Sequence, residues 1–321
     1  MMHALPHLLG LEGLSRDRLT AILDLSRTMK QISARAIPKV PTLRGRTVAN
    51  MFFENSTRTR FSFEIAEKRL SADTMTFTAS GTSVAKGESL QDTVRTIEAM
   101  GVHVVVIRHG ASGAPHFVAR HVNAAVINAG DGQHEHPTQG LLDMFTVQEN
   151  LGRLSGIHIT YLGDIAHSRV ARSGIIGFTT MGAQVTVCGP QTLMPAEVER
   201  LGVRVCERLE DALEGADVVN VLRLQLERQR QALFPSVQEY FRVYGLTRER
   251  AAGLKSDALI MHPGPMNRGT EIAAEVADER RSVIVDQVTN GVAVRMAVLC
   301  MLEGVDAAQE LQKVKEEVVH A

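Results

Sequence analysis

The sequence predicts an α/β protein of two domains, each built on a parallel sheet flanked by helices. Short apolar runs alternate with segments of helical periodicity along most of the chain. The runs are continuously apolar, which is typical of strands that helices cover on both faces of a parallel sheet. The chain has 321 residues, enough for about two domains, and the alternation is interrupted near residues 136–152.

The elements of the first half follow from periodicity and from helix-start residues. A helix begins after Ser56 and has Phe61, Ile65 and Leu70 on one face. We also expect strands at residues 47–53, 102–107 and 125–128, a polar stretch at residues 78–89, and helices after Ser15 and at residues 90–100 and 137–150.

The second half repeats the alternation after Gly152. We expect strands at residues 157–162, 184–188, 218–222, 258–261 and 283–286, and helices at residues 170–181 and 292–302. In open α/β sheets, ligands bind beyond the carboxyl ends of the strands, and the polar motifs of both halves follow strands. The sequence therefore predicts an active site in the cleft between the two domains.

Composition excludes several classes of function. The net charge of −1 gives no overall field that would attract nucleic acid or a membrane surface, and the absence of Trp argues against base stacking. Three widely spaced cysteines predict neither a disulfide framework nor a thiolate zinc site. The longest uncharged stretch, residues 173–196, is interrupted by polar residues and Pro, so we expect no membrane span. We expect a cytoplasmic protein.

The segment that follows the first strand is typical of an anion site. Ser56, Thr57, Arg58 and Thr59 lie at a helix N-terminus, where free N–H groups and the helix dipole favour a negative ligand. Hydroxyl groups and a guanidinium add donors that suit phosphate oxygens. The alternative is a simple N-cap with a surface arginine. The density of donors exceeds what capping requires and favours phosphate.

Two further motifs follow strands of the first half. Arg108 comes directly after residues 102–107, at the same sheet edge as the anion site, and this position favours a role in binding. The alternative is a solvated or paired arginine with no such role. His136 could polarise a carbonyl, and Gln139 can donate to and accept from an amide. A metal site is the other interpretation, because His134 and His136 have an H-x-H spacing near Asp131. No second ligand cluster is evident, so we expect no metal.

The motifs of the second half suit a small dicarboxylate and an amide. Residues 163–169 follow a strand but lack the G-x-G-x-x-G glycines of a dinucleotide site. They provide Arg169, and the strand at residues 218–222 is followed by Arg223 and Gln225. Two guanidinium groups suit a small dicarboxylate, and scattered surface arginines are the alternative. Residues 262–269 are rich in Pro and Gly, so their carbonyl groups could hold an amino group, or they could form only a rigid turn.

Taken together, these motifs resemble those of the aspartate and ornithine carbamoyltransferases, in particular the aspartate branch. The likeness covers almost the whole chain, in family order. The matching stretches are FFENSTRTRFSFE (52–64), SVAKGES (83–89), VIRHG (106–110), NAGDGQHEHPTQGLLD (128–143), GDIAHSRVARS (163–173), LRLQLER (222–228), HPGPMNRG (262–269) and DQVTNGVAVRMAVL (286–299). The His-Cys-Leu-Pro segment and Ser-Met-Gly loop expected of an ornithine enzyme are absent from the sequence.

The resemblance implies transfer of a carbamoyl group from carbamoyl phosphate to the amine of L-aspartate, which gives N-carbamoyl-L-aspartate and phosphate and is the committed step of de novo pyrimidine biosynthesis. It implies a carbamoyl-phosphate-binding domain at residues 1–135, with a C-terminal helix of residues 291–310 packed against it. A linking helix at residues 136–152 and an aspartate-binding domain at residues 153–290 follow. It requires no cofactor, and it implies a homotrimer, which regulatory or dihydroorotase-like chains could join.

The resemblance also implies roles for individual residues. The residues that bind carbamoyl phosphate are Ser56, Thr57, Arg58, Thr59, Arg108, His136, Gln139, Gly264, Pro265 and, from a neighbouring subunit, Ser83. Thr59, Arg108 and His136 would hold the carbonyl oxygen, and Gln139 with the Pro265 carbonyl group the carbamoyl nitrogen. Those that bind aspartate are Arg169, Arg223, Gln225 and, again from a neighbour, Lys86. The catalytic set is Arg58, Thr59, Arg108, His136 and Lys86.

Two other classes of function are weighed against this one. A catalytically silent scaffold of the same family would have lost site residues, and none of those named above is missing. An NAD-dependent dehydrogenase is disfavoured because the phosphate-binding glycines are absent.

Overall fold

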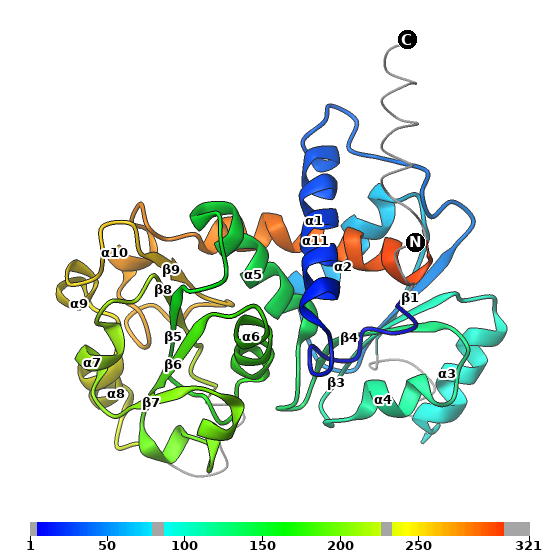
Figure 1. Cartoon of the computed structure of the whole chain (residues 1–321). Helices are drawn as coiled ribbons and strands as arrows, with labels where there is room; N and C mark the ends of the chain where they lie inside the picture. Colours follow the sequence, from blue (N-terminus) through cyan, green and yellow to red (C-terminus); the bar gives the residue numbers. More distant parts are fainter. Residues whose placement is uncertain (1–4, 79–86, 226–232, 305–321) are drawn as a thin grey trace. The chain divides into compact units, whose positions relative to one another are not determined.

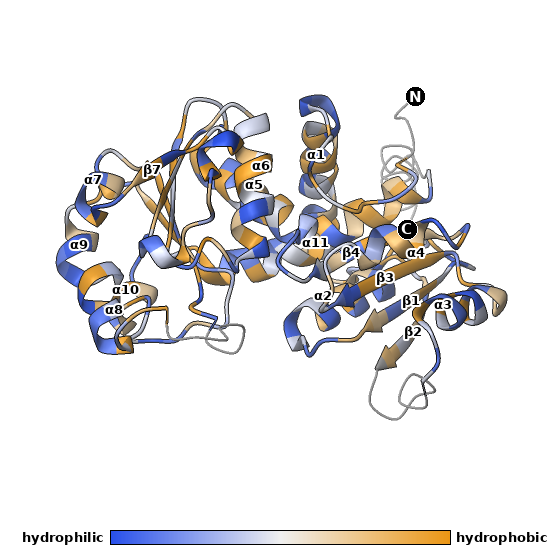
Figure 2. Ribbon diagram, turned by 90° about the horizontal axis from the view of Figure 1, so that it is seen from below, coloured by the Kyte–Doolittle hydropathy of each residue, from blue (hydrophilic) through white to orange (hydrophobic). Residues whose placement is uncertain are grey.

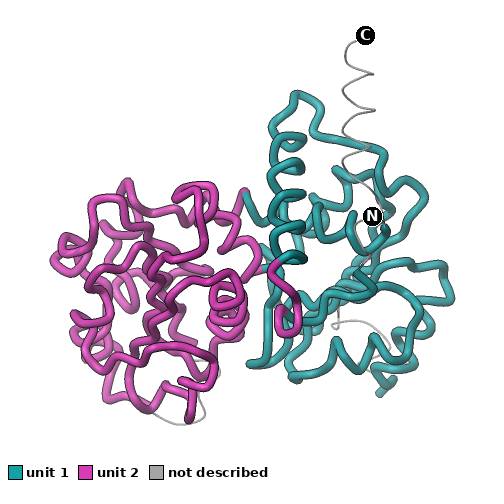
Figure 3. The backbone as a smooth tube through the Cα atoms, in the orientation of Figure 1, with its two compact units in different colours: residues 1–10, 17–138, 290–321 teal, residues 11–16, 139–289 magenta. Residues whose placement is uncertain are grey.

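The computed structural model describes residues 5–78, 87–225 and 233–304. The chain divides into two compact units (Figure 3). Unit 1 comprises residues 1–10, 17–138 and 290–321, and unit 2 comprises residues 11–16 and 139–289. The division after Thr138 falls in the first turn of α5 (Pro137–Leu151), and residues 11–16 group with unit 2 although they precede most of unit 1 in sequence.

Unit 1 is built on a four-stranded parallel sheet in the order β2-β1-β3-β4. The strands are β1 (Thr47–Phe52), β2 (Asp73–Thr78), β3 (Val104–His109) and β4 (Ala125–Asp131). The helices are α1 (Arg16–Ser33), α2 (Thr57–Arg69), α3 (Leu90–Ala99), α4 (Ala114–Ala119) and most of α11 (Ile284–Leu302). Strands β1, β3 and β4 are largely apolar and buried, as expected for strands that are covered on both faces (Figure 2).

The two faces of this sheet are covered by different helices. On one face, Ala49 and Met51 of β1 pack with Val94 of α3 and Val118 of α4. Asn50 points to the other face because side chains alternate along a strand, and its Nδ2 donates to both carboxylate oxygens of Glu67 on α2, at 2.9 Å each. Figure 1 shows α2 and α11 on one side of the sheet and α3 and α4 on the other.

Unit 2 is built on a five-stranded parallel sheet in the order β7-β6-β5-β8-β9. The strands are β5 (His158–Leu162), β6 (Gln184–Cys188), β7 (Arg204–Cys206), β8 (Val218–Val221) and β9 (Leu259–Met261). The helices are α5, α6 (Arg169–Thr180), α7 (Leu209–Leu213), α8 (Val237–Tyr244), α9 (Arg248–Ala252) and α10 (Ala274–Ala277).

One face of this second sheet packs closely on α6. A Cβ atom at Gly174 of α6 would lie 1.8 Å from the hydroxyl oxygen of Tyr161, a buried residue of β5. Gly174 therefore permits the close approach of the helix to the sheet. The opposite face of the sheet is covered by α7, α9 and α10, whose buried residues include Leu209, Ala251 and Val276.

Parallel sheets flanked by helices confirm the predicted fold class, and most predicted elements are present. The predicted strand at residues 283–286 is wrong. Helix α11 begins at Ile284, earlier than the predicted residue 292, and Ser282 forms only an isolated bridge with Ile260. A short apolar run cannot be distinguished from the first turn of a buried helix by periodicity alone. The sequence analysis did not predict β2 and β7, which each lie at one edge of their sheet, or the short helices α4 and α7–α10.

The predicted face of α2 is also wrong. Leu70 is buried, but Phe61 is 47% exposed and Ile65 is 42% exposed. The buried face of α2 instead includes Phe63 and Glu67. The carboxylate of Glu67 is buried because Asn50 provides a partner for it, which hydrophobic periodicity does not reveal.

The remaining general predictions concern thiols and membranes. Cys188, Cys206 and Cys300 are buried and free, which agrees with the prediction that they form no disulfide framework. Among the described helices, α11 has the length and apolar composition of a membrane span. Because 72% of its most apolar window is buried within the protein, α11 resembles the core helix of a globular unit.

Candidate active site

Both sheets have a point at which the winding of the chain reverses. In unit 1 this point lies between β1 and β3, and in unit 2 it lies between β5 and β8. Ligands of open α/β sheets bind outside the carboxyl ends of the strands at such a point. Each of these four strands ends at a predicted motif: residues 54–59 after β1, Arg108 near the end of β3, residues 163–169 after β5 and residues 223–225 after β8.

The anion site of unit 1 has the predicted helix N-terminus. Ser56 is the N-cap of α2 with extended backbone, and its side chain makes no capping hydrogen bond. The first turn of α2 has no acidic residue that would repel an anion. Thr57 and Arg58 are exposed, Ser56 is half-buried and Thr59 is buried. The capping interpretation of the Ser56 hydroxyl therefore has no support in the geometry, and its donor remains suited to a ligand.

Arg108 lies beside this N-terminus. Its carbonyl oxygen accepts a hydrogen bond of 2.9 Å from the N–H of Phe53, which joins the ends of β3 and β1. Its side chain, 15% exposed, has Nε 3.6 Å from a carboxylate oxygen of Glu54 and donates from Nη1 to the Ala129 carbonyl at 3.3 Å. The structure thus brings Arg108 and the segment after β1 to one edge of the sheet.

The turn after β4 is organised by a buried carboxylate. Asp131 is fully buried and accepts hydrogen bonds from the N–H groups of Gly113, at 2.6 Å, and Glu135, at 3.1 Å. It also accepts from Asn128 Nδ2 at 2.8 Å. These bonds fix the turn that ends at His136, which is 4% exposed and lies directly before α5.

One group that could hold a metal ion combines two residues of this turn with His116 of α4, and it does not include His136 of the H-x-H spacing. The ligand atoms of His116, Asp131 and His134 lie within 4.8 Å of one another. His134 Nδ1 lies 3.1 Å from Asp131, and the same carboxylate already accepts three N–H donors. These bonds explain the cluster as support for the turn, and the expectation that the protein uses no metal stays a prediction.

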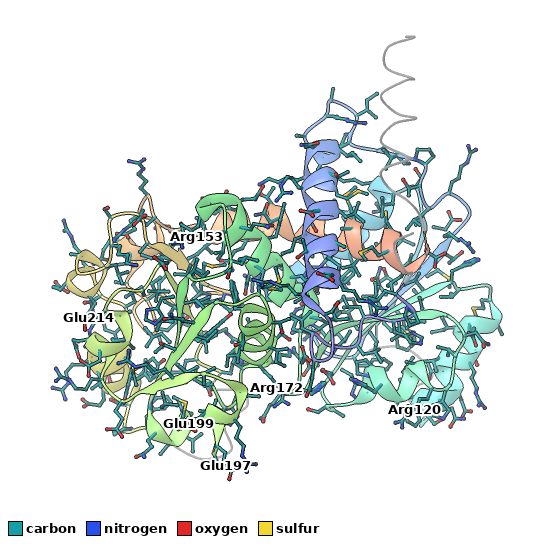
Figure 4. The ribbon with its side chains drawn as sticks, viewed as in Figure 1. Arg120, Arg153, Arg172, Glu197, Glu199 and Glu214 are labelled. Carbon is teal, nitrogen blue, oxygen red and sulfur yellow. The ribbon has the colours of Figure 1, made fainter. Side chains whose placement is uncertain are left out.

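In unit 2, the loop after β5 places Arg169 at a helix start. Asp164 is fully buried and accepts from the backbone N–H of His167 at 3.1 Å, while Ser168 caps α6 by accepting from the Ala171 N–H at 3.1 Å. Arg169 is only 3% exposed. Other charged residues of unit 2, such as Glu199 and Glu214, are exposed on its exterior (Figure 4).

The loop after β8 meets the loop after β5. Gln225 Nε2 donates to the His167 carbonyl oxygen at 3.3 Å. Arg223 is half-buried in the same short segment. The structure therefore brings Gln225 to the loop that leads into Arg169, at the sheet edge where a ligand of unit 2 would bind.

The loop after β9 is held by buried polar groups. The backbone N–H of His262 donates to Gln287 Oε1 at 3.0 Å, and His262 Nδ1 accepts from the N–H of Gly264 at 2.7 Å. His262 Nε2 lies 3.1 Å from Glu271, and both side chains are fully buried. The peptide bond between Gly264 and Pro265 is cis, and Pro265 is exposed. The loop is thus a well-supported turn with an accessible tip.

Gln139 has a partner that the sequence analysis did not identify. Its Nε2 donates at 2.9 Å to Asp143, one turn further along α5. A glutamine followed by an aspartate at i+4 is a known helix pair, so the sequence contained this signal. Burial, and next the charge of Asp143, raise the pKa of the nearby Tyr161 hydroxyl, which therefore stays neutral. Ser83 and Lys86 lie outside the described residues.

Two family models match the chain. The model described as the carbamoyl-P binding domain of aspartate/ornithine carbamoyltransferase matches residues 6–149. The model described as the Asp/Orn binding domain of the same enzymes matches residues 155–302. The chain belongs to the aspartate/ornithine carbamoyltransferase family. The resemblance stated from the sequence motifs is thereby confirmed.

Named members of the aspartate/ornithine carbamoyltransferase family are similar to the chain over nearly its full length. The chain is 60% identical over 297 residues to the aspartate carbamoyltransferase catalytic subunit of Heliobacterium modesticaldum, covering 92% of this chain and 95% of that protein. It is 61% identical over 297 residues to the catalytic subunit from Desulforamulus reducens, with the same coverage.

Solved structures of the aspartate/ornithine carbamoyltransferase family share the fold. The structure of aspartate transcarbamoylase from Trypanosoma cruzi with carbamoyl phosphate and aspartate has a TM-score of 0.85 at 29% identity, covering 94% of this chain and 97% of that chain. The catalytic subunit of M. jannaschii aspartate transcarbamoylase has a TM-score of 0.81 at 35% identity, covering 93% and 98%.

Proposed function

We propose that the protein transfers the carbamoyl group of carbamoyl phosphate to the amine of L-aspartate, giving N-carbamoyl-L-aspartate and phosphate. The observation that supports this best is the pairing of an anion site with a second basic site in a member of this family. Unit 1 has donors at the N-terminus of α2 beside Arg108, and unit 2 has Arg169 near Gln225. One site suits a phosphate and the other suits two carboxylates.

The residues of unit 1 bind carbamoyl phosphate in this proposal. Ser56, Thr57, Arg58 and Thr59 donate to the phosphate together with Arg108. Thr59, Arg108 and His136 donate to the carbonyl oxygen, where negative charge develops as the amine attacks. Fixed donors of this kind stabilise the transition state, and removal of one typically lowers the rate by about 10²–10³-fold.

The residues of unit 2 bind the second substrate and the carbamoyl nitrogen. Arg169, Arg223 and Gln225 bind the carboxylates of aspartate. Gln139 and the carbonyl group of Pro265, beside Gly264, accept from the carbamoyl –NH2. The uncharged amine attacks the carbonyl carbon, the bond between this carbon and the phosphate oxygen breaks, and phosphate leaves with the amine proton into a site that already complements its charge. Binding both substrates in one cleft removes most of the entropic barrier to their encounter.

The assembly and the location of the protein are further parts of the proposal. We propose a cytoplasmic homotrimer in which Ser83 and Lys86 of one subunit complete the site of its neighbour. Lys86 then contributes to both catalysis and aspartate binding. Attachment of regulatory or dihydroorotase-like chains, and the cleft between the two domains, stay predictions.

A coupled phosphate assay tests the function directly. Purified protein given carbamoyl phosphate and L-aspartate should release inorganic phosphate and form N-carbamoyl-L-aspartate. L-Ornithine should not replace aspartate, and chelators should leave the rate unchanged because no metal takes part. Phosphate release with ornithine but not with aspartate would contradict the proposal.

A further inference from the structure

Asp143 of α5 is a fully buried carboxylate to which three side-chain amides donate. Its Oδ1 accepts from Gln139 Nε2 at 2.9 Å and from Gln287 Nε2 at 2.7 Å. Its Oδ2 accepts from Asn220 Nδ2 at 3.3 Å. All four residues belong to unit 2. A buried acceptor with several amide donors is costly to disrupt, because each donor would lose its partner in a buried site.

The chemistry of this contact settles the orientation of the amides. A carboxylate oxygen accepts hydrogen bonds, so the –NH2 group of Gln139 must face Asp143. The amide is planar, and its Oε1 is therefore turned away from Asp143 as a hydrogen-bond acceptor. The same reasoning orients Gln287, whose Nε2 faces Asp143 and whose Oε1 accepts from the His262 N–H at 3.0 Å.

Gln287 extends the contact to the loop after β9. Its Oε1 holds the backbone of His262, and His262 Nδ1 in turn accepts from the N–H of Gly264 at 2.7 Å. Gly264 precedes Pro265. Asp143 is thus linked by hydrogen bonds both to Gln139 and, through Gln287, to the loop that contains Pro265. These are the two groups to which the proposed function gives the same task, namely acceptance from the carbamoyl nitrogen.

We propose that Asp143 is a positioning residue that makes the protein selective for a carbamoyl –NH2 group over an isosteric methyl group. This inference rests on the proposed function. Asp143 keeps Gln139 Oε1 turned towards the substrate and, through Gln287, holds the Pro265 carbonyl in place. Acetyl phosphate has a methyl group where carbamoyl phosphate has its –NH2, so it leaves both acceptors without a donor. A site built to accept hydrogen bonds rejects an analogue that cannot donate them.

The test compares the affinities of carbamoyl phosphate and acetyl phosphate by titration calorimetry. The wild-type protein should bind carbamoyl phosphate more tightly. Asp143→Leu replaces the acceptor with an apolar side chain of similar size. In this variant the dissociation constant for acetyl phosphate divided by that for carbamoyl phosphate should fall about tenfold, the value of one misplaced hydrogen bond. A structural role alone would weaken both ligands equally and leave the ratio unchanged, which would overturn the inference.

Two further variants sharpen the result. Asp143→Asn should retain the ratio of dissociation constants. The carbonyl oxygen of the new amide can still accept from Gln139 and Gln287, and its –NH2 group can donate to Asn220 once the Asn220 amide turns its oxygen towards it. An equal loss in the Asn and Leu variants would overturn the positioning role. Asp217→Leu is the control in the same unit, since Asp217 accepts a hydrogen bond from the backbone N–H of His158 at 2.8 Å at the amino end of the sheet, away from the loops of the candidate site. It should leave the ratio unchanged.

A folding defect in Asp143→Leu would not end the test. Gln287→Leu removes only the link to the loop after β9, and it should lower the same ratio by about threefold to tenfold. An unchanged ratio in a folded Gln287→Leu protein would then overturn the inference. Failure of the proposed function has a different signature, because the wild-type protein itself would neither bind carbamoyl phosphate nor release phosphate with aspartate.

Discussion

At the scale of single residues, the candidate site combines exposed donors with buried carboxylates that order other parts of the site. Arg58 and Thr57 are exposed, whereas Asp131, Asp143 and Asp164 are each fully buried. Asp131 and Asp164 accept from backbone N–H groups of segments that lead to site residues, and Asp143 accepts from the side-chain amide of Gln139 itself. Buried carboxylates need such partners to offset the loss of water, so the same contacts that stabilise them also order the loops.

Arg58→Ala tests the phosphate cradle. The change should lower kcat by at least about a hundredfold, because it removes a charged donor from the transition state. Steady-state kinetics with saturating substrates measure the effect. Arg60→Ala is the matched control on the same helix, since Arg60 pairs with Glu64 at 3.7 Å and should change kcat little. Near-normal turnover of Arg58→Ala would exclude this segment from the site.

Arg223→Ala tests the assignment of the second substrate. The KM for aspartate should rise much more than the KM for carbamoyl phosphate, since loss of a charged hydrogen bond costs about 1.5–3 kcal/mol. Arg153→Ala, at an exposed position of unit 2 shown in Figure 4, should alter neither constant. Equal increases for both substrates in Arg223→Ala would show that Arg223 has a structural role.

At the scale of elements, helix α2 combines the anion site at its start with a buried carboxylate near its end. Burial raises the pKa of Glu67 from 4.5 to about 7, although Asn50 donates to both of its oxygens. Desolvation therefore outweighs the hydrogen bonds. The helix that presents the phosphate donors is thus tied to the sheet by a group that titrates near neutral pH.

The raised pKa of Glu67 predicts a pH-dependent stability. Between pH 4.5 and about 7 the unfolded chain has lost this proton and the folded chain has kept it, so stability falls as pH rises through this window. The free energy of unfolding falls by roughly 3 kcal/mol in total, and the fall is complete above the pKa that Glu67 has in the folded protein. Glu67→Gln removes the titration. Urea unfolding at pH 5 and pH 8 should therefore show a smaller loss in the variant, and parallel changes in the two proteins would refute the assignment.

At the scale of the whole molecule, the proposed trimer predicts complementation between inactive variants. Lys86→Ala and His136→Ala homotrimers should each be nearly inactive, because each lacks one contributor to every site. Mixed trimers should regain activity, since some sites then combine an intact His136 with a neighbour's intact Lys86. Activity is measured after denaturation and reassembly of the mixture. Mixed trimers that are verified by mass but inactive would place Lys86 outside the neighbouring site.

The sequence by itself determined the fold class, the central strands and the positions of the site motifs. Buried parallel strands are recognisable because their apolar residues are continuous, as in β1, β3 and β5. The motifs are recognisable because loops at the carboxyl ends of such strands need not pack a core, so polar residues there are informative. The comparisons confirm the family, whereas the roles of the site residues stay predictions.

Only the tertiary structure decided which polar groups are partners and where marginal elements lie. Edge strands such as β2, with its sequence DTMTFT, are not continuously apolar because one side of the strand lacks a neighbour. The buried face of α2 depends on Asn50, which provides the partner for the Glu67 carboxylate. Asp143 and Gln287 are 144 residues apart in sequence. Contacts over such separations leave no local periodicity, so folding alone brings them together and reveals what they orient.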